Sequence, residues 1–164
     1  MKKVTTPCVG DNIISENNDP YDKTTYKSAI GMLIFLSKAT RPDISFAVHK
    51  AARNSENPTI TDWRKVENIL KYLNSTIDYR ITYDGQGNIV AYTDSDFAGD
   101  IKDRKSTSGY IILLGNNPIS WMSKKQSIVA TSTDETEYIS ASQCIKKLLW
   151  IKNILFELID LINQ

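Results

Sequence analysis

The stretch Tyr-Thr-Asp-Ser-Asp-Phe-Ala-Gly-Asp occupies positions 92–100 and joins an apolar run to a polar turn. The residues from 89 to 94 predict a short strand, because β-forming side chains fill the run and turn-forming residues bound it. Asp94 then stands at the carboxyl end of that strand. Clustered Asp residues beside a Gly also form ordinary solvated turns, so the stretch is compatible with a site or with a plain turn.

Two further strands are expected after this stretch, at 108–114 and 119–124. The residues Gly-Asn-Asn-Pro at 115–118 form a turn between them. Short connections of this kind favour antiparallel pairing of neighbours along the chain. The sequence therefore predicts a three-stranded antiparallel meander.

A long helix is expected from Thr133 to about Leu161. Ser132 followed by Glu135 has the form of a capping box, which marks a helix start. The apolar stripe expected to face the sheet consists of Tyr138, Ala141, Ile145, Leu148 and Leu149.

The N-terminal half has a different pattern. Residues 1–22 are polar and aperiodic, which predicts a flexible leader. Helical spacing then predicts helices over 24–38, from 43 to about 54, and from an N-cap at Thr61 to about 73. Alternation at 79–83 suggests a short strand. The turn-rich residues 84–88 mark a boundary between a helical segment, 23–84, and a second domain, 85–164.

Composition sets limits on the function. Hydrophobic residues make up 41% of the 164 residues, which argues against wholesale disorder. A net charge of +1 gives no global attraction to nucleic acid, so any such binding must come from local patches. Cys8 and Cys144 lack metal-ligand spacing and are expected to be free thiols. Without a long apolar run the protein is expected to be soluble, intracellular and free of membrane contact.

Glu137 provides a second carboxylate, in the first turns of the long helix. A carboxylate at a strand end and another on a packed helix can converge, as hydrolysis of a phosphodiester by two divalent cations requires. The alternative is that Asp134, Glu135 and Glu137 only complement the positive end of the helix dipole. Spacing alone does not choose between these interpretations.

A calcium loop is a further interpretation of positions 94–105. Counting Asp94 as position one, Asp96 and Gly99 fall where an EF-hand needs them. Ala98 and Lys105 occupy positions where acidic ligands belong, so the calcium interpretation fails.

Four motifs follow one another in the second half of the chain. They are Tyr-Thr-Asp at 92–94, Ser-Thr-Ser-Gly-Tyr at 106–110, Ser-Trp-x-Ser-Lys-Lys-Gln at 120–126 and Glu-Thr-Glu-Tyr at 135–138. Their order resembles the ribonuclease H domain of copia-type retrotransposons. The helical half is similar to the segment that follows the polymerase palm in the same polyproteins. Its motifs are 26–31, Thr-Arg-Pro-Asp-Ile at 40–44, Trp63 and 69–73. Phe97 stands where the family usually has Trp, and Asp62 where it commonly has His.

The resemblance implies an α/β fold in an α+β arrangement. Residues 23–84 would be a thumb- or connection-like tail of the reverse transcriptase, and 85–164 a C-terminally incomplete ribonuclease H-like domain. Asp94 and Glu137 become catalytic residues and ligands of Mg²⁺, or of Mn²⁺. The family tolerates non-acidic residues at the position of Asp96. The residues expected to contact nucleic acid are Arg104, Lys105, Ser106, Thr107, Ser108, Lys124 and Lys125.

The implied substrate is an RNA–DNA hybrid, and the implied partner is the remainder of the Pol polyprotein. The family's other two ligands lie further along its chain, so these 164 residues alone are expected to be inactive. The expected location is a cytoplasmic virus-like particle or the nucleus. A non-catalytic transposon relic and an unrelated interaction domain with surface acids are the alternatives.

Overall fold

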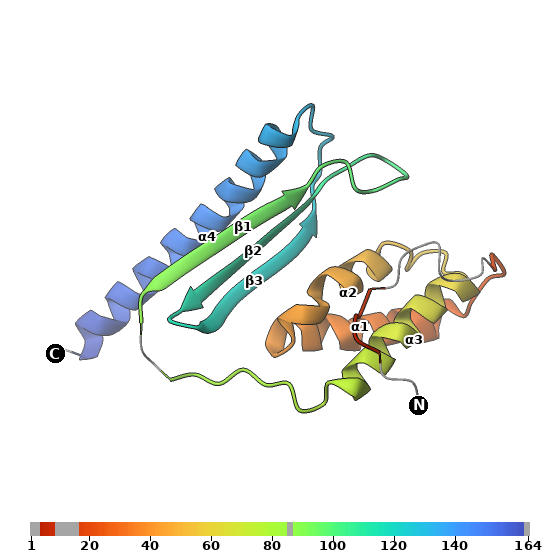
Figure 1. Ribbon diagram of the computed structural model, residues 1–164, viewed down its shortest axis with the longest axis horizontal. Coiled ribbons are helices and arrows are strands. Elements are labelled where there is room, and N and C mark those ends of the chain that lie inside the picture. Colours follow the sequence, from red (N-terminus) through yellow and green to blue (C-terminus); the bar gives the residue numbers. More distant parts are fainter. Residues whose placement is uncertain (1–3, 9–16, 85–86, 163–164) are drawn as a thin grey trace. The chain divides into compact units, whose positions relative to one another are not determined.

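The computed structural model describes residues 4–8, 17–84 and 87–162 (Figure 1). The chain divides into two compact units, a helical unit from Met1 to Ile81 and a sheet unit from Thr82 to Gln164. The helical unit contains α1 (Lys23–Ala39), the 3₁₀ turn η1 (Pro42–Ile44), α2 (Ser45–Ala52) and α3 (Ile60–Ser75). The sheet unit contains β1 (Ile89–Asp96), β2 (Thr107–Leu114), β3 (Asn117–Lys125) and α4 (Thr133–Ile162). The α+β fold class is therefore confirmed.

Side-chain caps set two of the helix starts in the helical unit. The Asp22 carboxylate accepts a hydrogen bond from the Thr25 amide at the start of α1. At the start of α3, Thr59 and Asp62 form a reciprocal capping box. The expected N-cap at Thr61 is wrong by two residues, because Asp62 pairs with Thr59 and the helix begins one residue after it.

The core of the helical unit is apolar and continuous. Its buried side chains recur every three or four residues along each helix, as expected for helices that pack together. They are Tyr26, Ala29, Ile30, Leu33, Ile44, Ala47, Val48, Ala51, Val66, Ile69 and Tyr72.

A buried arginine closes this unit at the end of α3. The Arg41 guanidinium donates two parallel hydrogen bonds to the Asp43 carboxylate, at 3.0 and 2.8 Å. It also donates to the carbonyl and the hydroxyl of Thr76, at 3.2 and 2.6 Å. The rings of Tyr72 and Tyr79 both lie 5.7 Å from it. Arg41 thus joins the start of η1 to the residues that follow α3.

The three strands of the sheet unit form an antiparallel sheet in the order β1-β2-β3. Asp94 lies opposite Gly109 in the β1–β2 register. The expected meander is confirmed, and each strand extends one to three residues beyond its predicted bounds. Among the described residues β1 is an edge strand, with one side of its backbone open.

The expected strand at 79–83 does not form. Residues 79–84 lie outside any helix or strand, although their side chains alternate. Alternation makes a strand only when a partner strand is beside it, and Tyr83 uses its hydroxyl to bond the Pro118 carbonyl instead.

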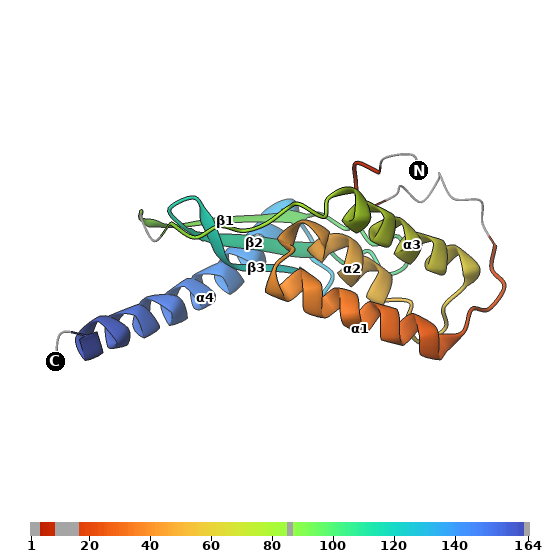
Figure 2. The same ribbon diagram turned by 90° about the horizontal axis from the view of Figure 1, so that it is seen from below.

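The helix α4 packs against β1 and β2. Figures 1 and 2 show it along one face of the sheet, with its last turns extending beyond the strands. Ile112 on β2 and Cys144 and Ile151 on α4 form the buried core between them. Within the described residues, no helix is long and apolar enough to cross a membrane.

The apolar stripe expected on α4 faces the sheet only in part, because Leu148 packs against the buried core but three other members do not. Tyr138, Ile145 and Leu149 are 77%, 54% and 54% exposed. The helix instead turns a mixed stripe inward, which contains Thr136, Ser140, Cys144 and Ile151. Because α4 is apolar on two sides, helical spacing predicts two candidate stripes. The buried stripe contains Thr and Ser, which a hydrophobic pattern does not count.

Candidate functional site

Asp94 lies two residues before the end of β1 and is exposed. Its neighbours Thr93 and Ser95 both bond to α4, through the hydroxyls of Ser140 at 2.7 Å and Thr136 at 2.8 Å. Because side chains alternate along a strand, the Asp94 side chain points to the other face of the sheet. Its backbone carbonyl still accepts a hydrogen bond from Ser140, at 2.8 Å.

Glu137 is exposed in the second turn of α4. It directly follows Thr136, which is buried, accepts the hydrogen bond from Ser95 and donates one to the Thr133 carbonyl. Asp94 and Glu137 are therefore next in sequence to Ser95 and Thr136, the two residues that this hydrogen bond joins. The expectation that the Asp94 and Glu137 carboxylates share one cation remains a prediction, because this hydrogen bond brings only the backbones of the two residues near each other.

The two carboxylates do not start from the same face of the sheet. Asp94 points away from α4, whereas Glu137 belongs to it, so the sheet lies between the starting points of the two side chains. Carboxylate oxygens are the ligands that Mg²⁺ and Mn²⁺ prefer. Within residues 4–8, 17–84 and 87–162, no group of three His, Cys, Asp or Glu side chains could hold a metal.

The three hydroxyl residues expected to contact nucleic acid face inward. Ser106, Thr107 and Ser108 are 1%, 7% and 1% exposed. The Ser106 hydroxyl accepts a hydrogen bond from the Ala98 amide, at 3.0 Å, and the Ser108 hydroxyl accepts one from the Gln126 side chain, at 2.9 Å. The Ser106 hydroxyl thus holds the loop between β1 and β2 in place, whereas the Ser108 hydroxyl joins β2 to the residue that follows β3.

The expected cationic contacts differ in how accessible they are. Arg104 and Lys124 are exposed and Lys105 is half-buried. Lys125 lies between the carboxylates of Asp100 and Asp103, at 2.5 and 2.8 Å.

The electrostatic partners of Lys125 change its pKa and that of Asp103. Burial opposes the charge on Lys125, but the two carboxylates outweigh it and raise the pKa of its ammonium. The hydrogen bond from Lys125 lowers the pKa of Asp103. Lys125 therefore mainly stabilises the loop between β1 and β2. Arg104 and Lys124 are more accessible to a ligand.

Asp96 and Gln126 organise this region in a way that the sequence pattern does not indicate. The Asp96 carboxylate accepts a hydrogen bond from the Thr107 amide and lies against Gly99, where a Cβ atom would overlap it. The buried Gln126 side chain donates to Ser108 and to the Thr136 carbonyl. Gln126 is the last residue of the motif at 120–126. A hydrophobic pattern does not predict its burial, because its side chain is polar.

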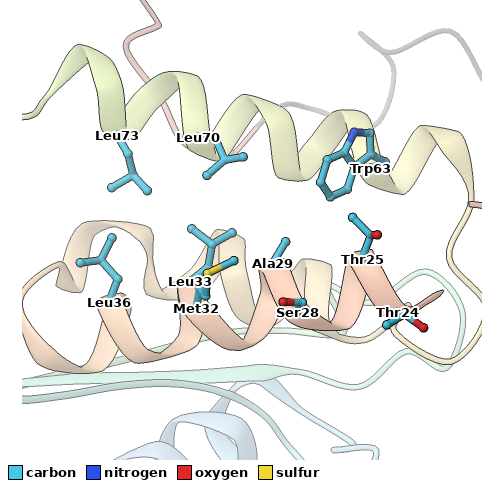
Figure 3. Close-up of a pocket in the computed structure, with 10 residues that line it drawn as sticks. All are labelled: Thr24, Thr25, Ser28, Ala29, Met32, Leu33, Leu36, Trp63, Leu70 and Leu73. Carbon is cyan, nitrogen blue, oxygen red and sulfur yellow. The ribbon is translucent and has the colours of Figure 1, made fainter. Parts of the chain in front are cut away.

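The helical unit carries an apolar groove between α1 and α3, with a volume of about 590 Å³ (Figure 3). Side chains of the two helices point toward one another across it. The groove is lined by Thr24, Thr25, Ser28, Ala29, Met32, Leu33, Leu36, Trp63, Leu70 and Leu73. None of these side chains titrates, so the groove can bind but offers no acid–base chemistry. The hydrophobic pattern of the sequence does not indicate this groove.

No family model matches the chain, and no solved structure matches it. The chain is 40% identical to the retrovirus-related Pol polyprotein from transposon TNT 1-94 of Nicotiana tabacum, over 96% of its own length and 12% of the polyprotein's. It is 42% identical to the Pol polyprotein from transposon RE2 of Arabidopsis thaliana, over 84% of its own length and 10% of the polyprotein's.

A third relative is of similar size to this chain. The secreted RxLR effector protein 161 of Plasmopara viticola is 38% identical, over 77% of this chain and 90% of the effector. By contrast, the chain spans only about a tenth of the length of the Pol polyproteins it matches. The shared identity over most of its length shows that the chain belongs to the family of copia-type retrotransposon Pol polyproteins.

Proposed function

We propose that the sheet unit is part of a ribonuclease H domain that hydrolyses the RNA strand of RNA–DNA hybrids. The observation that carries this proposal is the bond between Ser95 and Thr136, which brings the backbones of Asp94 and Glu137 together in a chain of the Pol family. Asp94 and Glu137 would be two of the carboxylate ligands. The proposed site of action is intracellular, in a cytoplasmic virus-like particle or the nucleus.

Divalent Mg²⁺ or Mn²⁺ would activate a water molecule and stabilise the oxygen that leaves the cleaved phosphodiester. Asp94 and Glu137 would supply negative oxygens for such a cation from the two sides of the open β1 edge. The Asp94 side chain is exposed and can turn toward that edge, because its only hydrogen bond to a described residue is a 2.9 Å contact with the Ser95 amide. Further carboxylates would have to come from the rest of the Pol polyprotein.

Hybrid binding would use the exposed cations beside this position. Arg104 and Lys124 would contact phosphates as positioning groups, without reading sequence. Lys105 and Lys125 would contribute less, because they are partly buried. Ser106 and Thr107 would act indirectly, by fixing the loop that carries Arg104, and Ser108 by holding the Gln126 side chain.

The metal part of the proposal is tested with Mn²⁺ and the ¹⁵N-labelled chain. Mn²⁺ is paramagnetic and broadens the amide signals of residues near it. We expect the signals of Asp94, Ser95 and Glu137 to broaden first, and Asp94→Asn to remove this effect. The matched control is Asp134→Asn, which removes an exposed carboxylate from the same helix start. Broadening that persists in Asp94→Asn, or that centres on other residues, contradicts the proposal.

A non-catalytic interaction protein is the second candidate. It is favoured by the relative named as a secreted effector, because this chain covers 90% of that protein. The same titration distinguishes the two, since an interaction protein requires no cation at Asp94.

A further inference from the structure

We infer that the segment between the two units is a hinge of three residues, Arg80, Ile81 and Thr82, with a fixed anchor on each side. This inference does not depend on the proposed function. It rests on which unit each neighbour of the hinge bonds to.

The first anchor belongs to the helical unit and ends at Tyr79. Arg41 holds Thr76 by two hydrogen bonds, and the Tyr79 ring lies 5.7 Å from the Arg41 guanidinium. The Tyr79 amide also donates to the Thr76 carbonyl, at 3.0 Å. The chain therefore remains attached to α3 for four residues after the helix ends at Ser75.

The second anchor belongs to the sheet unit and begins at Tyr83. The Tyr83 hydroxyl donates to the Pro118 carbonyl, at 3.0 Å, and the Asn117 side chain donates to the Asp84 carboxylate, at 2.6 Å. Both partners lie at the start of β3. The chain is thus attached to the sheet before β1 begins.

Between the anchors, the described residues Arg80, Ile81 and Thr82 form no hydrogen bond or ion pair. Arg80 and Thr82 are exposed and Ile81 is half-buried. The boundary between the two compact units falls between Ile81 and Thr82, inside this segment. Rotation about these few backbone bonds changes the orientation of one unit without breaking a contact in either.

The two anchors differ in strength. Arg41 is buried, and a charged hydrogen bond in a buried setting is stronger than a neutral one at the surface. Tyr83 is 60% exposed, so water competes for its bond to Pro118. The second anchor should open first and lengthen the hinge toward β1.

The test is ¹⁵N relaxation of the full chain. We expect backbone order parameters below about 0.6 at residues 80–82 and near 0.85 at Tyr79 and Asp84, which are the values for flexible and rigid backbone. Order parameters that are uniform from residue 77 to residue 84, whether high or low, would overturn the inference.

Two variants test the anchors separately. Tyr83→Phe removes one hydroxyl and should extend the flexible segment through residue 83, with 77–79 unchanged. Tyr79→Ala should extend it in the other direction. Tyr92→Phe removes an exposed hydroxyl elsewhere in the sheet unit and should change neither side. An unchanged profile in both anchor variants also overturns the inference.

Discussion

The Ser95 hydroxyl on β1 donates a hydrogen bond of 2.8 Å to the Thr136 hydroxyl on α4. Thr136 is almost completely buried, so this contact lies inside the helix–sheet interface. It fixes the start of α4 against the end of β1, and it thereby sets where the backbones of the candidate ligands Asp94 and Glu137 lie.

Replacing Thr136 with Val should destabilise the sheet unit. The change keeps the shape of the side chain but removes the acceptor for Ser95 and the donor to Thr133. We expect a loss of about 1–2 kcal/mol, as for a buried hydrogen-bonded group left without its partner. Urea unfolding followed by circular dichroism measures the loss. Ser142→Ala, at an exposed position of the same helix, is the control and should leave the midpoint unchanged. Equal midpoints for Thr136→Val and wild type would refute the assignment.

The stability of the helical unit should fall in acid through Asp43. Burial alone would raise the pKa of Asp43, but hydrogen bonds from Arg41 and Tyr72 outweigh it and lower the pKa. A lowered folded-state pKa means that the contribution is present above the unfolded pKa, about 3.9. It is lost as the pH falls through the folded value.

Asp43→Asn isolates this contribution. At neutral pH we expect it to cost about 2–3 kcal/mol, below the range for a fully buried pair because Asp43 is partly exposed. The difference from wild type should shrink as the pH falls below about 4. Thermal unfolding at a series of pH values measures both. Asp78→Asn, at an exposed carboxylate, is the control. A difference that does not depend on pH would rule out the Arg41–Asp43 pair as its source.

Arg104→Asn should both stabilise the loop between β1 and β2 and weaken the binding of an RNA–DNA hybrid. Arg104 has φ 56°, in the left-handed region, where Asn is tolerated better than Arg. We expect a gain of up to about 1 kcal/mol in unfolding free energy. If Arg104 contacts a phosphate, the salt dependence of binding should lose about one unit of slope. Lys146→Gln, on the exposed side of α4, is the binding control. A more stable variant with unchanged hybrid affinity would remove Arg104 from the interface.

The 164-residue chain by itself should not degrade hybrid RNA. Two carboxylates can hold one cation loosely, but the mechanism must stabilise both the attacking and the leaving oxygens. A displacement of about 1 Å can already cost a hundredfold in rate. The assay mixes the chain with a labelled RNA–DNA hybrid and Mg²⁺, with Asp94→Asn as control. Cleavage that disappears in the variant would show that these residues suffice. Activity restored by the next segment of the polyprotein in trans would show a divided enzyme.

The sequence predicted the sheet well because its signals are local. Turn-forming residues follow the apolar run of β2, and the short turn after Leu114 favours an antiparallel hairpin between β2 and β3. The start of α4 at Thr133 followed in the same way from Ser132 and Glu135, whose side chain bonds to Thr131.

The errors arose where the outcome depends on distant partners. The segment 79–83 alternates like a strand, but the contacts of Tyr79 with Arg41 and of Tyr83 with Pro118 decide its path. The face of α4 that packs was chosen by hydroxyls that match Thr93 and Ser95 across the interface. The inward role of Ser106 depends on the Ala98 amide, and that of Ser108 on Gln126, which follows β3. None of these pairings can be seen in a single stretch of sequence.

The open edge of β1 lies in a sheet whose helix also exposes Tyr138, Ile145 and Leu149. A row of unpaired amides and carbonyls near apolar side chains is a surface on which identical chains can stack into aggregates. The isolated chain should therefore aggregate as its concentration rises, even under conditions in which it stays folded. In a cell, the same surface would make the chain a substrate for chaperones and for degradation until something covers it.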